Sequence, residues 1–258
     1  MNILEKIVQH KGKEVNERKS EVSVAALENG RFFQRTTLSL KKSLRNPQKT
    51  GIIAEYKRKS PSKGIINAKD SVEAVTKAYY AFGASGISIL TDHEFFGGSL
   101  DDLIAARDNG IPILRKDFVI DEYQIIEAKA YGADVILLIA GCLTPGEVKN
   151  LSASAQKLGL EVLLEIHDET ELEHVCETID IVGVNNRNLK TFEVDLQHSV
   201  QLAEKIDNHF LKVAESGIHS VEDVHFLKQH GFNGFLIGEF FMKQKSPMEA
   251  FKNFTYLL

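Results

Sequence analysis

The stretch Gly51-Ile-Ile-Ala-Glu-Tyr56 is a short apolar run that ends in polar residues, and it is the first of eight such runs along the chain. Near-continuous apolar runs are typical of strands that are covered on both faces, as in a parallel sheet. The other seven runs cover residues 86–91, 112–117, 135–140, 161–166, 181–186, 212–217 and 234–238. We therefore expect eight parallel strands.

Helix signals lie between these runs. Thr144-Pro-Gly-Glu147 and Ser246-Pro-Met-Glu249 each combine an N-cap residue, a proline at the first helical position and a glutamate at the capping-box position. Looser versions occur at Asp168-Glu-Thr-Glu171 and Ser220-Val-Glu-Asp223. The glycines that we expect to end helical stretches are Gly83, Gly110, Gly132, Gly159 and Gly231.

This alternation predicts the α/β class, and eight units are the number that closes a (β/α)8 TIM barrel. The 258 residues are close to the roughly 250 of one such domain. The rival fold, a doubly wound open sheet, is favoured by a G-x-G-x-x-G turn after the first strand, which this chain lacks. We expect one domain over residues 1–258. Residues 1–47 form its helical N-terminal extension, packed on the barrel, because Ile3, Leu4, Ile7 and Val8 fall at helical spacing.

Composition excludes several classes of protein. The formal net charge is −5, whereas nucleic-acid binders usually carry a basic excess. No apolar run approaches the ~20 residues of a membrane span, and the N-terminal stretch has no apolar core of a signal peptide. We therefore expect a cytoplasmic protein with no nucleic-acid or membrane partner, in which Cys142 and Cys176 stay unpaired.

Polar residues gather at the carboxyl ends of five predicted strands. Side chains two positions apart share a face of a strand, so Ile53 shares a face with Glu55 and Lys57. The residues predicted in this way to surround one mouth of the barrel are Glu55, Lys57, Lys116, Glu165, Asn185, Arg187 and Glu215. Structural ion pairs or solvated strand ends are the alternative interpretation. Five contributions to one rim favour an active site, which lies at this end in such barrels.

Two glycine turns, Ser216-Gly217 and Gly238-Glu239, follow the last two predicted strands. Loops at these positions are the usual phosphate site of the barrel fold. Glycine permits close approach of the backbone, and backbone N–H groups at a helix start favour an anion. The pair of turns therefore favours a phosphorylated substrate.

Together with their neighbours, these residues resemble the indole-3-glycerol phosphate synthase family from about Ile3 to the C-terminal helix. The most specific stretch is Ile53-Ala-Glu-Tyr-Lys-Arg-Lys-Ser-Pro-Ser62. The other matching stretches are residues 90–99, 114–118, 183–189, 214–218 and 236–238, with Glu165. Asn188 stands where an aspartate is common in the family. Glu239 replaces a small residue seen in some members, and we expect its carboxylate to point away from a phosphate.

The resemblance implies a carboxy-lyase of tryptophan biosynthesis. The substrate would be 1-(2-carboxyphenylamino)-1-deoxyribulose 5-phosphate, and the products indole-3-glycerol phosphate, CO2 and water. No metal or organic cofactor is implied, and we expect a monomer. Lys116 would be the general acid at the carbonyl, and Glu165 the acid–base group for later proton transfers. Lys57 would hold the substrate carboxylate, oriented by Glu55. The implied pocket residues are Phe96 near the anthranilate ring, Asn185, Arg187, Glu215 and Glu239, with Ser216, Gly217 and Gly238 at the phosphate.

Chemistry adds two expectations. Lys57 and Lys116 lie near each other, so the charge of one lowers the pKa of the other towards neutrality, as acid–base catalysis requires. The polar, basic loop 58–64 leaves the strand that carries Lys57, and we expect it to act as a mobile lid. A plain solvated loop is the alternative.

Four other functions are weaker. Lys116 as a Schiff-base residue would indicate an aldolase-like enzyme. Phosphoribosylanthranilate isomerase is the nearest related barrel, but it lacks this N-terminal extension. A metal site at His93 has no second histidine at ligand spacing on the same element. A sugar-phosphate sensor would bind substrate without turning it over.

Overall fold

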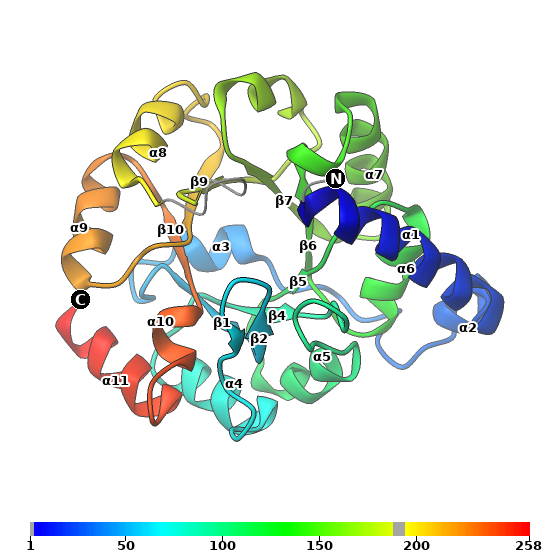
Figure 1. Ribbon diagram of the computed structural model, residues 1–258, viewed down its shortest axis with the longest axis horizontal. Helices are drawn as coiled ribbons and strands as arrows, with labels where there is room; N and C mark the ends of the chain where they lie inside the picture. Colours follow the sequence, from blue (N-terminus) through cyan, green and yellow to red (C-terminus); the bar gives the residue numbers. More distant parts are fainter. Residues whose placement is uncertain (1–2, 188–193) are drawn as a thin grey trace.

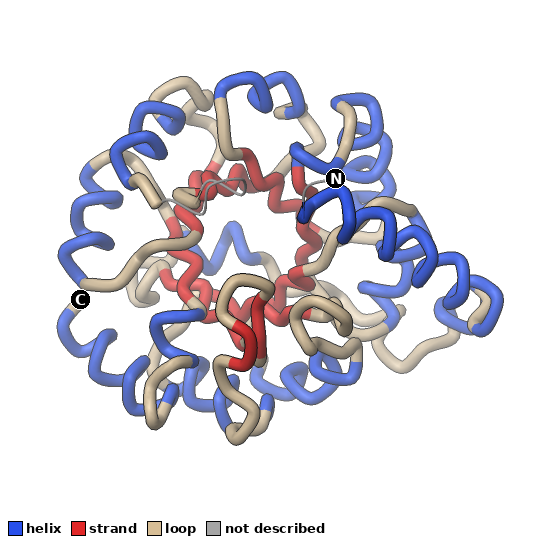
Figure 2. The backbone as a smooth tube through the Cα atoms, in the orientation of Figure 1, coloured by secondary structure: helices blue, strands red, loops and turns tan. Residues whose placement is uncertain are grey.

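The computed structural model describes residues 3–187 and 194–258, in which eight parallel strands form a closed barrel. Around the ring the strands run in the order β1-β10-β9-β8-β7-β6-β5-β4. Figure 2 shows the strands as a ring surrounded by helices. They are β1 Ile52–Tyr56, β4 Gly86–Leu90, β5 Ile113–Lys116, β6 Val135–Ile139, β7 Glu161–Ile166, β8 Ile181–Asn185, β9 Leu211–Glu215 and β10 Gly234–Ile237. The TIM barrel and all eight predicted strands are confirmed.

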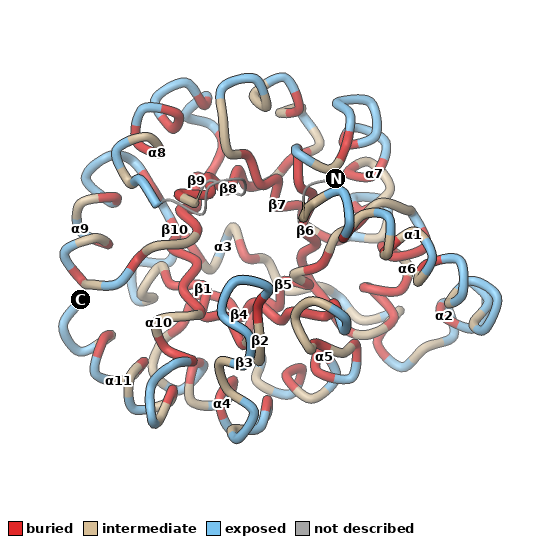
Figure 3. The backbone as a smooth tube through the Cα atoms, viewed as in Figure 1, coloured by how far each residue is buried: buried red, intermediate tan, exposed pale blue. Residues whose placement is uncertain are grey.

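Side chains alternate between two apolar clusters. Ile53, Leu114, Leu163 and Val213 belong to the cluster inside the barrel. Their neighbours along the strands, such as Ile52, pack outward against the surrounding helices. Figure 3 shows that burial is concentrated in the strands and on the inner faces of the helices. The predicted faces are therefore correct, and the polar residue two positions after each inner residue is carried to the mouth.

Helices surround the barrel (Figure 1). They are α4 Val72–Ala81, α5 Asp101–Ala106, α6 Glu122–Ala130, α7 Pro145–Lys157, α8 Leu196–Ala203, α9 Val221–Gln229, α10 Glu239–Met242 and α11 Pro247–Leu257, with 3₁₀ turns η1 Arg107–Asn109 and η2 Ala140–Cys142. Capping boxes start α7 at Thr144 and α9 at Ser220, and Ser246 caps α11. All five predicted stop glycines have positive φ, as a left-handed helix end requires.

The helix predicted to start at Asp168 is instead a short 3₁₀ helix, η3 Glu169–His174. Asp168 does cap it, since its carboxylate accepts a hydrogen bond from the backbone N–H of Thr170. Only residues 167–180 connect β7 to β8, whereas residues 140–160 connect β6 to β7. The shorter connection holds only this short 3₁₀ helix.

The N-terminal extension touches both ends of the barrel. Its helices are α1 Ile3–Glu21, α2 Val24–Glu28 and α3 Leu40–Leu44. Figure 1 shows α1 in front, running from the rim of the barrel near β6 outward past α6, and α3 behind, at the opposite end. Leu40 and Leu44 of α3 join the inner apolar cluster and so close the barrel floor.

Cys142 and Cys176 are both free thiols, as expected. None of the helices within residues 3–187 and 194–258 has the length and apolar character needed to cross a bilayer.

Candidate active site

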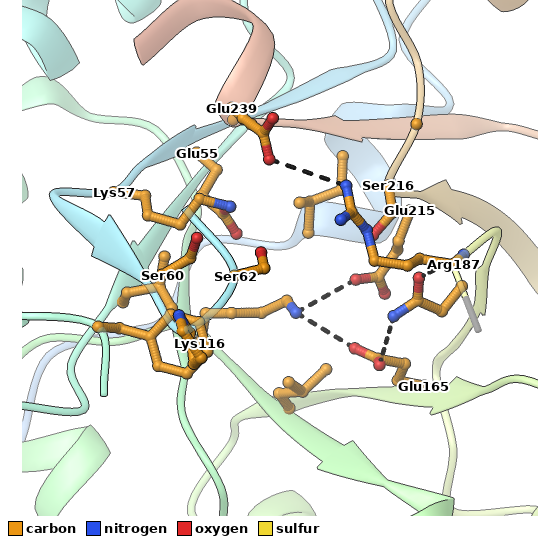
Figure 4. Close-up of a pocket in the computed structure, with 18 of the residues that line it drawn as sticks. Glu55, Lys57, Ser60, Ser62, Lys116, Glu165, Arg187, Glu215, Ser216 and Glu239 are labelled. Atoms are coloured by element: carbon orange, nitrogen blue, oxygen red, sulfur yellow. Dashed lines mark hydrogen bonds and ion pairs between the residues drawn. The ribbon is translucent and has the colours of Figure 1, made fainter. Parts of the chain in front are cut away.

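One pocket at the carboxyl ends of the strands brings the predicted site residues together (Figure 4). All twelve line it: Glu55, Lys57, Phe96, Lys116, Glu165, Asn185, Arg187, Glu215, Ser216, Gly217, Gly238 and Glu239. They come from β1, β5, β7, β8 and β9, from the loops that follow the strands and from the first residue of α10. The barrel thus joins side chains that are far apart in the sequence.

Lys116, at the end of β5, reaches two carboxyl groups. Its Nζ lies 3.2 Å from Oε2 of Glu165 and 3.3 Å from Oε2 of Glu215 (Figure 4). Burial alone lowers the pKa of Lys116, but the carboxylates of Glu165, Glu215 and Glu55 outweigh it and raise this pKa above its ordinary value. The expected lowering by Lys57 is wrong, because Lys57 is paired with Glu55, at 2.8 Å, and the neighbours of Lys116 are acidic.

Glu165 is held in place by Asn185. The Nδ2 of Asn185 donates a hydrogen bond of 2.8 Å to Oε1 of Glu165, while Lys116 contacts the other oxygen. The Oδ1 of Asn185 accepts a 3.0 Å hydrogen bond from the backbone N–H of Arg187. Asn185 therefore fixes the orientation of the Glu165 carboxyl group from the neighbouring strand.

Glu215 is the most perturbed acid of the site. It is buried, and burial raises its pKa to about 8, with Lys116 lowering it and Glu165 raising it further. A side chain on Gly183 of β8 would collide with Glu215, so this glycine makes room for the acid. The sequence placed Glu215 on the pocket wall without indicating that its pKa is raised.

Glu55 has the opposite electrostatic setting. Burial raises its pKa, but Lys57 and Lys116 outweigh this effect, so the pKa lies below its ordinary value. Ser88 of β4, which the sequence analysis missed, donates a 3.3 Å hydrogen bond to Oε2 of Glu55. Ser88 lies directly opposite Glu55 on the neighbouring strand. Its inward position on the predicted strand 86–91 could have identified it as a member of the site. A Cβ on Gly238 would lie 2.7 Å from that of Glu55, so Gly238 also makes room for Glu55.

The turn after β9 is strained. Ser216 has φ of 68° and Gly217 has φ of 69°, and a positive φ is uncommon for a residue other than glycine. Asn186 stabilises the turn, since its Nδ2 donates a 2.7 Å hydrogen bond to the carbonyl oxygen of Ser216. Strain of this kind is concentrated at ligand sites.

Across this turn, Arg187 and Glu239 form a loose ion pair of 3.7 Å (Figure 4). Glu239 starts α10 immediately after Gly238. Its carboxylate therefore faces a cation of the pocket, and its orientation relative to a bound phosphate stays a prediction.

The apolar side of the pocket is larger than the sequence indicated. Phe96 was the one predicted member, and its ring centroid lies 6.1 Å from that of Phe118. Phe118 follows Lys116 by two positions and therefore points to the same side of the chain. This spacing could have identified Phe118 as a pocket residue from the sequence. Further apolar lining residues include Ile3, Leu4, Ile7, Leu90, Leu137 and Ile139. The first three come from α1, so the N-terminal extension forms part of the pocket wall.

The loop after β1 is a short hairpin formed by β2 Lys59–Ser60 and β3 Gly64–Ile65. Ser60, Pro61 and Ser62 line the pocket, so this hairpin overhangs the mouth. Its base is fixed by Arg58, whose guanidinium forms a two-pronged contact with Asp102, one of the two hydrogen bonds being 2.8 Å long. Lid movement of this hairpin stays a prediction.

Metal ligands are not gathered in the described part of the chain, where no three His, Cys, Asp or Glu side chains are placed to hold one ion. His93 is exposed beside the loop that carries Phe96. Asn188 and Leu189, which belong to one of the motifs, lie outside the described residues.

The sequence model of the family described as "Indole-3-glycerol phosphate synthase" matches residues 4–254. The chain belongs to the indole-3-glycerol phosphate synthase family. Family members include proteins of this name from Bacteroides thetaiotaomicron, 46% identical over 98% of this chain and 97% of its relative, and from Acinetobacter baylyi, 41% identical over 96% and 94%. The synthase of Koribacter versatilis is 49% identical over 76% of each chain.

Solved structures of other families share the fold alone. The tryptophan synthase alpha subunit of Legionella pneumophila aligns with a TM-score of 0.62 at 14% identity, covering 84% of this chain and 95% of the other. Thiamine phosphate pyrophosphorylase of Pyrococcus furiosus aligns with a TM-score of 0.59 at 15% identity, covering 85% and 97%.

Proposed function

We propose that this barrel catalyses the reaction for which its family is named. It converts 1-(2-carboxyphenylamino)-1-deoxyribulose 5-phosphate to indole-3-glycerol phosphate, CO2 and water, as a carboxy-lyase of tryptophan biosynthesis. One observation carries the proposal: Lys116 is held between Glu165 and Glu215 in a pocket with an aromatic wall and a glycine turn of the phosphate-binding type. The substrate has the matching parts, an aromatic ring, a central carbonyl and a phosphate.

Ring closure is the first chemical step. The aromatic carbon that bears the carboxylate attacks the carbonyl carbon, and the carbonyl becomes a hydroxyl group as it takes up a proton. Lys116 donates this proton and stabilises the negative charge that develops on the oxygen. The raised pKa keeps Lys116 an ammonium at neutral pH. An ammonium is no nucleophile, which disfavours the Schiff-base alternative.

Decarboxylation and dehydration complete the reaction. Cleavage of the bond to the carboxylate releases CO2, and its electron pair restores the aromatic ring. The hydroxyl group then leaves as water after receiving a proton, and the neighbouring carbon loses a proton to form the indole double bond. We assign these two transfers to Glu165, which contacts Lys116 through one oxygen and Asn185 through the other.

The remaining residues bind the substrate. Lys57, oriented by Glu55 at 2.8 Å, holds the substrate carboxylate. Phe96 and Phe118 pack against the anthranilate ring. The phosphate lies at the turns after β9 and β10, where Ser216, Gly217 and Gly238 offer backbone groups and a hydroxyl. Arg187 and Asn185 line the wall between these two sides, and Glu239 pairs with Arg187.

Three further parts belong to the proposal: the protein acts in the cytoplasm, as a monomer, and without nucleic acid. The net charge of −5 gives no basic excess for a phosphate backbone. We also expect turnover without added metal or organic cofactor. Sedimentation analysis of the purified protein tests the monomer, and assays with and without a chelator test the metal.

A turnover assay tests the reaction. Purified protein mixed with the substrate should produce the fluorescence of the indole product. The matched variant is Glu165→Gln, which keeps the side-chain shape and a hydrogen-bonding group for Asn185 but removes the acid–base function. It should lose most of the turnover while its melting temperature stays close to that of the parent. A parent protein that binds substrate and forms no indole would indicate a sensor and overturn the proposal.

A further inference from the structure

A buried ion cluster joins α1 to the barrel next to the pocket. Lys11 of α1 has 0% of its side chain exposed. Its Nζ lies 2.9 Å from Oδ2 of Asp92 and 3.0 Å from Oδ1 of Asp117, and it also contacts Glu14 at 2.8 Å. Burying an ammonium is costly unless it is paired, so this side chain is committed to the two aspartates that follow β4 and β5.

Each aspartate holds the backbone of a pocket phenylalanine. The Oδ1 of Asp92 accepts hydrogen bonds from the N–H groups of Phe95, at 2.7 Å, and Phe96, at 3.3 Å. The Oδ1 of Asp117 accepts a 2.8 Å hydrogen bond from the N–H of Phe118. Lys11 therefore bridges the two groups that set the positions of Phe96 and Phe118.

The two aspartates depend on Lys11 to different degrees. Asp117 has a second cation, because Arg115 contacts its Oδ2 at 2.9 Å, and Thr91 donates a 2.6 Å hydrogen bond to the same oxygen. For Asp92, Lys11 is the only basic side chain within 4 Å in the described part of the chain, and Asp92 is fully buried. Loss of Lys11 would leave an unpaired buried carboxylate close to a second one.

The buried ammonium group of Lys11 keeps its positive charge. Burial alone lowers its pKa, but Asp117, Asp92 and Glu14 outweigh burial and raise the pKa above its ordinary value. Lys11 is therefore charged at neutral pH and can pair with both aspartates.

We infer that Lys11 is a positioning residue for the aromatic wall of the pocket: by bridging Asp92 and Asp117 it fixes Phe96 opposite Phe118 and so sets the affinity for the anthranilate ring. The second part rests on the proposed function. The mechanism assigns no proton to Lys11, so its loss should change binding more than the chemical steps.

Kinetics and binding separate these effects. Lys11→Met should raise KM about tenfold, a change expected when an aromatic contact is lost, while kcat changes much less. The dissociation constant of the reduced substrate, whose carbonyl is an alcohol and which cannot close the ring, should rise by the same factor. Arg18→Met is the matched control. It removes an ion pair of 2.8 Å between the same helix and Glu127 without touching Asp92, and KM should stay unchanged.

A rescue variant tests the route through Asp92. Combining Lys11→Met with Asp92→Asn removes the unpaired charge but keeps an oxygen that accepts from Phe95 and Phe96. It should recover most of the lost affinity, and it also provides a folded protein if Lys11→Met alone is too unstable. Equal increases in KM for Lys11→Met and Arg18→Met, or no recovery in the double variant, would show that Lys11 only docks α1 and would overturn the inference.

A fluorescence probe tests the positioning without any substrate. The chain contains no tryptophan, so Phe96→Trp introduces a single one. Adding Lys11→Met to this protein should shift the emission to longer wavelength and increase quenching by acrylamide, whereas adding Arg18→Met should do neither. An unchanged spectrum with Lys11→Met refutes the positioning role. If the unaltered protein shows no turnover, the proposed function is wrong. The fluorescence probe still tests whether Lys11 positions residue 96, because it needs no substrate.

Discussion

The ammonium nitrogen of Lys116 lies 3.2 Å from a carboxyl oxygen of Glu165, although their strands, β5 and β7, are separated by β6. Both side chains point into the barrel mouth, where Glu215 reaches Lys116 from a third strand (Figure 4). The acid and the base proposed for the reaction are thus held in one contact network. Loss of any member changes the electrostatic setting of the others, so effects of single substitutions will not be additive.

Lys116→Ala removes the proposed proton donor. We expect kcat to fall by roughly 10²–10⁴, the usual contribution of general acid–base catalysis. Binding of the reduced substrate should survive in part, since Lys57 and the phosphate turns remain. Steady-state kinetics and a binding titration check this, and near-native kcat would rule out the role.

Glu215 makes stability depend on pH. Its pKa is raised from 4.5 to about 8, so above pH 4.5 the unfolded chain releases a proton that the folded protein keeps. The contribution of this group to stability therefore falls as pH rises from about 4.5 to about 8. The Glu215→Gln variant does not lose stability in this way, because glutamine does not titrate. The melting temperature of the variant minus that of the parent should become more positive between pH 6 and pH 9. A constant difference contradicts the raised pKa.

The phosphate should contribute to catalysis as well as to affinity. If its binding energy draws the β2–β3 hairpin over the mouth and brings Lys57 into place, a substrate without phosphate loses kcat as well as affinity. Inorganic phosphate or sulfate should compete weakly with the substrate. Steady-state kinetics on the dephosphorylated substrate decide the matter. A rise in KM with kcat untouched would mean that the phosphate only anchors the ligand and that the hairpin is no lid.

Leu40 closes the barrel floor, far from the mouth. Leu40→Ala removes a buried side chain from the inner cluster and should destabilise the protein by about 2–5 kcal/mol, as core truncations do. kcat/KM should remain close to the parent value below the melting transition. Leu257→Ala is the control, because Leu257 is 73% exposed and should cost little. Denaturant unfolding measures both variants. Equal stabilities would show that α3 is not part of the core.

Much of the site was predictable because it depends on local rules. Alternation along a strand placed Glu55, Lys116 and Glu165 on the inward face, and the barrel rule placed that face at one mouth. The same rule could have predicted Phe118 and Ser88. Phe118 shares its face with Lys116, and Ser88 lies opposite Glu55 on the next strand.

The eight apolar runs predicted the barrel by themselves, and the polar residues two positions after the inner ones predicted which strands contribute to its mouth. The raised pKa values of Glu215 and Lys116 and the bridge from Lys11 to Asp92 and Asp117 were decided only by the tertiary structure. A pKa depends on burial and on charges within a few ångströms, and those charges come from strands and helices that are distant in the sequence. Periodicity shows which face of a strand or helix is apolar, but only the packed chain shows what that face meets.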